Sequence, residues 1–204
     1  SPSGDSDGSL GDFDRVIVEE YYNRGEAFSE QEEYEKAIAE FSEAIRIKPD
    51  YAEAYYSRGF AYRQNYFENG IDDLEKAIHD LSEVIRIKPE RDLYLGRAEI
   101  YILNGDKRKA IADIDEVIRL EPDRRSDYLC RRCQLYKELG EYNKVIDDLT
   151  EIILCGEGDA NVYQNRGVAY QELGNKVRAK ADFTKAQKLG YDSWSKTWHG
   201  WDLW

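Results

Sequence analysis

The sequence lacks long apolar runs, an excess of basic residues and any methionine. Its apolar runs are only a few residues long, so no membrane insertion is predicted. The first residues, SPSGDSDGSLGD, have neither the basic start nor the apolar core of a secretory signal. The 204 residues include 42 acidic and 29 basic side chains, for a net charge of −13. Nucleic-acid phosphates and anionic lipids would repel such a surface, which excludes both as partners.

Residues that carry catalysis or bind metals are also scarce. The two histidines, His79 and His199, have no acidic or cysteine partners at the spacing of metal ligands. The sequence contains no phosphate loop, nucleophile elbow or paired-carboxylate signature. It therefore predicts no cofactor, no metal site and no enzyme. Because the chain does not start with methionine, its N-terminus is expected to be processed or trimmed. For this soluble chain, both a cytoplasmic location and tethering through the removed segment stay open.

The cysteines are few as well. Cys130, Cys133 and Cys155 are odd in number and too few for a disulfide framework, and they do not fix a redox compartment. Cys130 and Cys133 form the sequence CRRC, which has the spacing of a redox or metal pair. This motif lies inside a predicted helix, with no strand before it and no second pair, so core packing is the favoured interpretation. Cys155 is predicted to be another buried thiol.

An aromatic segment recurs about every 34 residues, with longer second and third intervals. The five copies are YYNRGEAF, YYSRGFAY, LYLGRAEIY, YLCRRCQLY and VYQNRGVAY. Each is followed by a turn such as LGEY and by a second apolar run such as AIAEFSEAIRIKP. Both segments keep apolar residues three and four apart, which predicts a helix, a turn and a helix in each copy. Residues 1–12, rich in Ser, Gly and Asp, are predicted to be a flexible leader.

The order of aromatic, small and proline positions resembles the tetratricopeptide repeat, or TPR. In the first copy the matching residues are Tyr21, Gly25, Phe28, Ala37, Phe41, Ala44 and Pro49. The fourth copy departs from the pattern at Glu157, where the proline is expected. The resemblance implies an all-α fold, a right-handed superhelical solenoid of five TPR helical hairpins with a C-terminal capping helix. The repeats are expected within one domain of residues 13–204, at about 18–51, 52–90, 91–125, 126–159 and 160–190.

The second repeat carries about six extra residues, in the stretch QNYFENGIDDLEKA. Ile71, Leu74 and Ile78 follow a heptad spacing in this stretch. The insertion is therefore predicted to lengthen the second helix of the repeat at its start, with NYFENG as the turn.

Each predicted first helix carries an arginine, and each second helix carries a carboxylate at a fixed offset. The pairs are Arg24 with Glu40, Arg58 with Asp80, Arg97 with Asp113, Arg132 with Asp148, and Arg166 with Asp182. Because a guanidinium near a core needs a carboxylate, ion pairs within the hairpins are predicted, with the pair in the third repeat mostly buried. Solvated charges on separate faces are the alternative.

The TPR resemblance implies that the first helices line a concave binding face. By repeat position, the main candidates are Glu19, Tyr22, Glu26, Glu53, Tyr56, Phe60, Arg63, Asp92, Leu95, Glu99, Ile102, Gln134 and Gln164. Some relatives bind a C-terminal carboxylate through Lys, Asn and Arg. Here those places hold Tyr22, Glu26, Ser57, Asp92 and Gly96, which offer no positive charge. The predicted ligand is instead a basic, partly apolar peptide or helix in an acidic groove, bound by a monomeric adaptor or scaffold.

Two alternatives stay open at this point. The acidity of the groove repeats the charge of the whole chain and is not by itself evidence of a ligand. The chain is alternatively a structural module that self-associates through its ends or its tail, WSKTWHGWDLW. Trp194, Trp198 and Trp201 share one helical face, so the tail is predicted to cap the second helix of the fifth repeat, around Phe183 and Ala186. The rival interpretation makes these aromatic residues an interface with another molecule.

Overall fold

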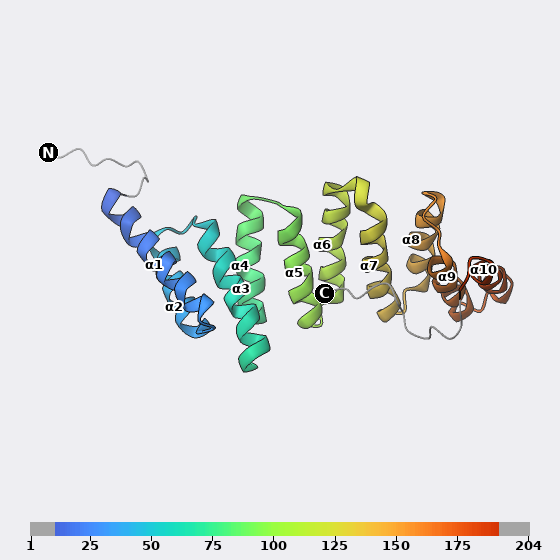
Figure 1. The fold of residues 1–204 in the computed structure, drawn as a ribbon, viewed down its shortest axis with the longest axis horizontal. Helices are drawn as coiled ribbons and strands as arrows, with labels where there is room; N and C mark the ends of the chain where they lie inside the picture. The colour runs from blue at the N-terminus through green and yellow to red at the C-terminus, as the bar shows by residue number, and fades with distance from the viewer. Residues whose placement is uncertain (1–10, 192–204) are drawn as a thin grey trace. The chain divides into compact units, whose positions relative to one another are not determined.

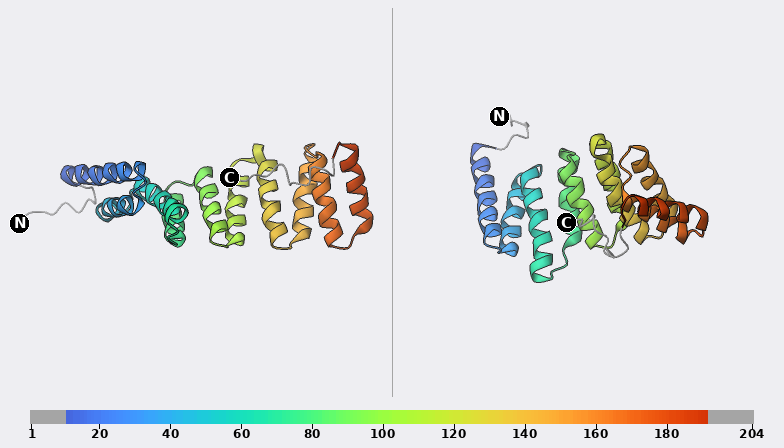
Figure 2. Two further views of the ribbon diagram at one scale, coloured as in Figure 1. Left: turned by 60° about the horizontal axis from the view of Figure 1, so that its bottom comes forward. Right: turned by 45° about the vertical axis from the view of Figure 1, so that its right-hand side comes forward.

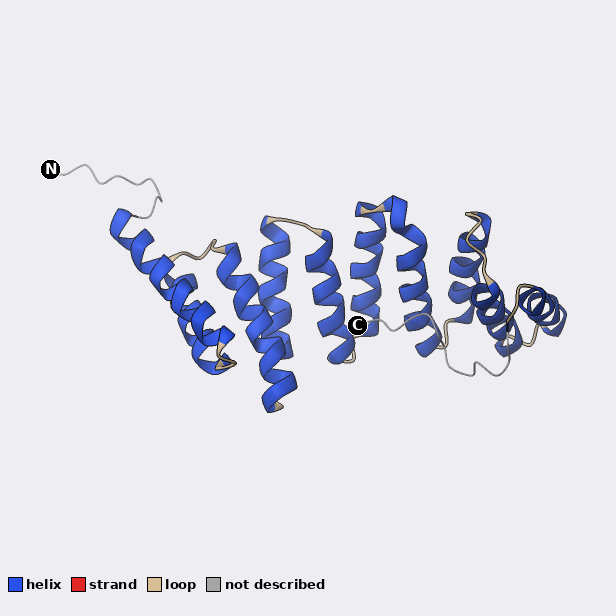
Figure 3. Cartoon of the chain, viewed as in Figure 1, coloured by secondary structure: helices blue, strands red, loops and turns tan. Residues whose placement is uncertain are grey.

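The computed structural model describes residues 11–191, and this part of the chain is helical (Figure 1, Figure 3). Between these residues there is no strand, and one short 3-10 turn, η1 (Pro122–Arg124), precedes α7. The helices are α1 (Asp12–Glu30), α2 (Tyr34–Ile47), α3 (Ala52–Asn69), α4 (Leu74–Ile87), α5 (Arg91–Leu103), α6 (Lys107–Leu120), α7 (Arg125–Glu138), α8 (Tyr142–Leu154), α9 (Ala160–Glu172) and α10 (Lys176–Lys188). The all-α fold predicted from the repeats is therefore confirmed.

The chain divides into two compact units with their boundary after Asp106: unit 1 contains α1 to α5, and unit 2 contains α6 to α10. In unit 1, α2 packs on both α1 and α3, and α4 packs on both α3 and α5. In unit 2, α7 contacts α6 and α8, and α9 contacts α8 and α10. Within each unit, helices adjoining in sequence pack together, as in helical repeats, and Figure 2 shows this succession from two further sides. The helices of the third repeat fall in different units, so one continuous solenoid stays a prediction.

The second helices carry the hydrophobic core on one face. In α2 the buried side chains are Tyr34, Ala37, Phe41, Ala44 and Ile45. Phe41 is fully buried, and Gly25 of α1 lies against its ring, where a Cβ atom would be 2.5 Å from Phe41 Cε1. In unit 2, a Cβ atom at Gly167 of α9 would lie 2.6 Å from the ring of Phe183. The repeat therefore has a small residue at the position of Gly25 and Gly167 because the two helices of the hairpin approach each other closely there.

The turn between the helices of a hairpin uses a left-handed backbone conformation. Gly140 and Gly174 hold this place in unit 2, with φ of 71° and 74°. In unit 1 the corresponding residue after α1 is Glu32, with φ of 61°. A side chain at such a φ is strained, so the first hairpin keeps the turn at a local cost in energy.

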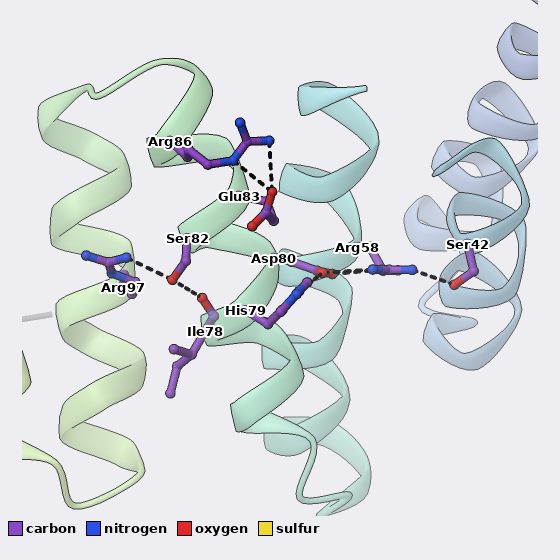
Figure 4. Close-up of polar contacts among 9 residues, drawn as sticks. All are labelled: Ser42, Arg58, Ile78, His79, Asp80, Ser82, Glu83, Arg86 and Arg97. Carbon is purple, nitrogen blue, oxygen red and sulfur yellow. Dashed lines mark hydrogen bonds and ion pairs between the residues drawn. The ribbon is translucent and has the colours of Figure 1, made fainter. Parts of the chain in front are cut away.

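The predicted ion pairs within the hairpins are present in both units. In unit 1, Nε and Nη2 of Arg58 donate to the two carboxylate oxygens of Asp80 at 2.7 and 2.8 Å. Figure 4 shows Arg58 between Asp80 of α4 and Ser42 of α2, to whose Oγ its Nη1 donates at 2.9 Å. In unit 2, the corresponding bidentate pairs are Arg132 with Asp148 and Arg166 with Asp182. Arg132 also donates to Asp115 of α6, and Arg166 donates to Thr150 of α8, so each of these arginines links its own hairpin to the preceding second helix.

The first and third repeats depart from this arrangement. Arg24 lies 2.7 Å from Glu40, as predicted, but both side chains remain in contact with solvent. Arg97 donates from Nη1 to Ser82 Oγ of α4 at 2.8 Å, which repeats the link between Arg58 and Ser42 (Figure 4). A pair of Arg97 with Asp113 would join the two units, and it stays a prediction.

The insertion in the second repeat lengthens α3, so the prediction that it lengthens the following helix is wrong. α3 has 18 residues, whereas α4 has 14, the same as α2. The NYFEN segment continues α3 because Asn65 is buried against the core and its side chain accepts a hydrogen bond from Asn69 at 2.7 Å. The helix ends at Gly70, whose φ of 67° suits a helix C-cap. Ile71, which suggested the heptad spacing, lies outside both helices.

The described part of the chain starts just before α1 and ends just after α10. α1 begins at Asp12, six positions before Val18, where the repeat pattern starts. The predicted tryptophan-rich cap lies outside the described residues. Between residues 11 and 191, none of the helices combines the length and the apolar character that a membrane span requires.

Candidate binding surface

The first helices of unit 1 contribute to one connected surface. The hydroxyl of Tyr22 on α1 is hydrogen-bonded to Ser57 Oγ on α3 at 3.4 Å. On the other side of α3, Nη2 of Arg63 lies 2.8 Å from a carboxylate oxygen of Glu99 on α5. These two contacts place α1, α3 and α5 side by side along the face that the repeat positions predict for binding.

A cleft of about 180 Å³ opens between α3 and α5. Side chains from both helices line it, together with Leu81 of α4. The lining residues are Tyr56, Gly59, Phe60, Arg63, Leu81, Asp92, Gly96, Glu99 and Ile100. Tyr56 and Phe60 are 50% and 43% exposed, which is high for aromatic side chains of a core-forming helix. Five of the predicted site residues, Tyr56, Phe60, Arg63, Asp92 and Glu99, therefore converge in one hollow.

The charges that line this cleft are paired. Glu99 is bound by Arg63, and Asp92 accepts from Nε of Arg91 at 2.7 Å. The cleft itself is thus less acidic than the sequence predicts. One donor in it lacks a partner: Nε of Arg63 is buried and makes no hydrogen bond. A buried donor without an acceptor costs about 1–3 kcal/mol, and such groups need a specific explanation.

The unpaired negative charge lies further along the surface, around Tyr22 and Tyr51. The centroids of these two rings are 5.3 Å apart. Burial raises the pKa of both phenols, and the nearby carboxylates of Glu26 and Glu53 raise it further. Glu19 also contributes to the raised pKa of Tyr51. We call Glu19, Glu26 and Glu53 the acidic patch. These three glutamates form no ion pair with any of the described residues.

The remaining predicted residues do not join the cleft. Leu95 and Ile102 are half-buried on α5 outside its lining. Gln134 of α7 donates to Glu138 Oε1 at 2.8 Å, and Gln164 lies half-buried on α9, so both belong to unit 2. The crevice between α7, α8 and α9 has a volume of only about 10 Å³, which is room for one water molecule at most. Within the described residues, a peptide side chain therefore fits the cleft of unit 1 and not this crevice.

The apolar and small residues that shape the cleft were not predicted from the sequence. Neither Leu81 nor Ile100 was among the predicted site residues, and Gly96 was considered only as a position without positive charge. The signal was present in the sequence, because the same repeat position holds Asn23, Ser57 and Asn165 in other copies. Gly96 has no side chain where these copies have a polar one, and its absence leaves space between α3 and α5.

The CRRC motif is part of the core of unit 2. Cys130 and Cys133 are buried free thiols, and Cys133 Sγ lies 3.7 Å from the carbonyl oxygen of Val145. Burial raises the pKa of both thiols, which makes them poor nucleophiles and poor metal ligands. No cluster of metal-ligating side chains occurs in the part of the chain that is described. The packing interpretation is supported, whereas the prediction that Cys155 is buried is wrong, because it lies exposed after the end of α8.

Thiol labelling will distinguish these sites. We expect one thiol, Cys155, to react rapidly with a disulfide reagent in the native protein, because only its sulfur is exposed. All three should react after denaturation, and Cys155→Ser should remove the fast phase. Rapid labelling of two or three thiols in the folded protein would contradict the burial of the CRRC motif.

Known proteins share the repeats and the fold. A family model described as a TPR repeat matches residues 25–65, and one described as a tetratricopeptide repeat matches residues 92–124 and 160–189. The solved structure of the MamA protein is 21% identical, with a TM-score of 0.61, over 84% of this chain and 91% of that chain. YrrB, described as a TPR protein with an unusual peptide-binding site, is 19% identical, with a TM-score of 0.61, over 91% and 96%. MamA from Desulfovibrio magneticus is 16% identical, with a TM-score of 0.57, over 89% and 97%. A search of curated proteins found no match.

Proposed function

Because the chain is a tetratricopeptide repeat protein, and its fold is that of a protein-interaction scaffold, we propose that unit 1 binds a basic, partly apolar peptide segment of a partner. The observation that carries this proposal is the juxtaposition of the cleft and the acidic patch along α1, α3 and α5. An apolar residue of the ligand enters the cleft beside Phe60. Basic residues of the same ligand lie against the acidic patch.

The two parts of the surface offer complementary interactions. Aromatic side chains such as Tyr56 and Phe60 provide apolar contact area at a low cost in conformational entropy. The three unpaired glutamates attract a cationic ligand from solution and favour lysine or arginine over neutral residues. YrrB, which shares the fold, is described as a TPR protein with an unusual peptide-binding site, and this supports a peptide as the class of ligand.

A charge reversal tests this function. A peptide is first selected from a random display library on the full chain. We expect the triple variant Glu19→Lys, Glu26→Lys and Glu53→Lys to bind it about tenfold to a hundredfold more weakly, because three attractive contacts of about 0.2–1 kcal/mol each become repulsive. Fluorescence anisotropy measures the affinity. Raising the salt concentration should weaken binding by the wild type, since exposed charges are screened within about 8 Å at physiological ionic strength.

The matched control carries the same change in net charge elsewhere. Glu35 and Asp72 of unit 1 and Asp123 of unit 2 are exposed carboxylates that belong neither to the cleft nor to the acidic patch, and their replacement by lysine should leave the affinity close to the wild-type value. Equal affinities for both triple variants, together with insensitivity to salt, would contradict the proposed function.

Self-association through the ends stays the alternative. In unit 2, α10 carries the exposed Lys180 and Gln187 where α8 has Ile146 and Ile153, and Val177 is the one large apolar residue of α10 that is exposed. A polar outer face of this kind is typical of a terminal repeat that meets solvent. We therefore favour the binding of a partner segment over end-to-end stacking of copies of this chain.

A further inference from the structure

Gly96 lies in the interior of α5 without a structural requirement for glycine. A Cβ atom added at this position would meet only Leu81 Cδ1 at 3.9 Å, an ordinary contact, whereas one at Gly25 would clash with Phe41. Gly96 is also not among the glycines with a positive φ. Glycine in the middle of a helix destabilises it relative to alanine. Neither packing nor backbone conformation therefore explains why residue 96 is a glycine. The cleft beside it does explain this, because a larger side chain would fill it.

The equivalent place between α1 and α3 is closed. There the position of Gly96 is held by Ser57, and Tyr22, which corresponds to Tyr56, is hydrogen-bonded to it. Between α3 and α5 the missing side chain leaves Tyr56 and Phe60 facing an open hollow. Of the two places where successive first helices of unit 1 meet, the one between α3 and α5 is therefore open, and it sets the register of a bound segment.

We propose that Gly96 creates a specificity pocket for one large apolar side chain, such as leucine or phenylalanine, of the peptide that unit 1 binds. This inference rests on the proposed function. The cleft has a volume of about 180 Å³, and a protein cavity of about 150 Å³ lined by apolar side chains holds a benzene molecule. Ile100 and Leu81 supply the apolar base, and Phe60 supplies the wall.

Arg63 gives the pocket a contact for the peptide backbone. Its guanidinium is held by Glu99 and lies over the ring of Phe67, with Cζ 5.4 Å from the ring centroid. Its Nε is the donor that lacks an acceptor in the described structure. A main-chain carbonyl of the ligand beside the buried side chain accepts this hydrogen bond after a small rotation of the guanidinium. The pocket therefore favours a peptide over a free apolar molecule.

Filling the pocket tests the inference. The peptide selected on the full chain, synthesised with and without its apolar residue replaced by alanine, is titrated against wild type, Gly96→Ala and Gly96→Leu. We expect roughly tenfold to hundredfold weaker binding by Gly96→Leu, because the burial of one large apolar side chain is lost. Gly96→Ala should reduce the affinity several-fold while raising the melting temperature. The alanine-substituted peptide should bind weakly to all three proteins.

The controls separate this inference from the proposed function. Asn23→Leu adds the same side chain at the equivalent position of α1, outside the cleft, and should keep wild-type affinity. If Gly96→Leu does not fold, as judged by circular dichroism, Gly96→Ala decides. Binding at wild-type affinity by Gly96→Leu, or by Gly96→Ala in that case, would overturn the pocket while leaving the proposed function in place. Failure of the acidic-patch reversal to weaken binding would overturn both.

Discussion

Replacement of Arg58 by alanine will lower the free energy of unfolding by about 3–5 kcal/mol, because it leaves a buried carboxylate without its partner. The side chain of Asp80 is 1% exposed, and each of its carboxylate oxygens accepts a hydrogen bond from this arginine, while His79 Nδ1 lies 3.3 Å from Oδ1. Arg58 also links α3 to Ser42 of α2, so its loss loosens the contact between neighbouring repeats. Chemical denaturation monitored by circular dichroism measures the effect.

Arg86 provides the matched control for this prediction. Figure 4 shows its contact with Glu83 of α4, and its side chain is 65% exposed. Arg86→Ala should cost no more than about 1 kcal/mol, as exposed ion pairs do. The combined replacement of Arg58 and Asp80 by apolar residues should recover most of the stability, since no charge is left buried. A loss for Arg58→Ala as small as that for Arg86→Ala would show that the pair contributes little.

Replacement of Gly25 by alanine will destabilise unit 1 by about 1–3 kcal/mol, because the new methyl group overpacks the core. Its Cβ would lie 2.5 Å from the fully buried ring of Phe41. Gly96→Ala is the matched control and should change the stability in the opposite direction, by about 0.5–1 kcal/mol, because a helical glycine is removed without a clash. Thermal denaturation compares the two variants. Equal shifts of the same sign would contradict the different roles assigned to these glycines.

The repeat itself made the fold predictable from the sequence. Because five copies repeat one pattern, Gly25 and Phe41 were recognised as residues of the repeat, and the structure shows that they face each other. The fixed offset between arginine and carboxylate likewise predicted the pair of Arg58 and Asp80. The insertion was predicted to lengthen α4 because Ile71 continued an apolar spacing. In the structure it lengthens α3, where Asn65 is buried.

The binding surface was predictable only in part. Repeat position placed Tyr56, Phe60 and Glu99 on the same face, and the structure brings them into one cleft. The sequence did not reveal that Arg63 neutralises Glu99, since that contact joins different repeats. It also did not reveal the hollow at Gly96, because the volume of a cleft depends on the side chains that are missing.

The most direct test of the binding surface is to map a bound peptide onto the chain by amide chemical-shift perturbation in two-dimensional NMR spectra. The selected peptide is added to the full chain labelled with ¹⁵N. We expect the largest shifts in α3 around Phe60 and in α5 around Gly96, with smaller shifts around Glu26 and Glu53. Shifts concentrated in α7 to α10, with α3 and α5 unchanged, would contradict the assignment of binding to unit 1.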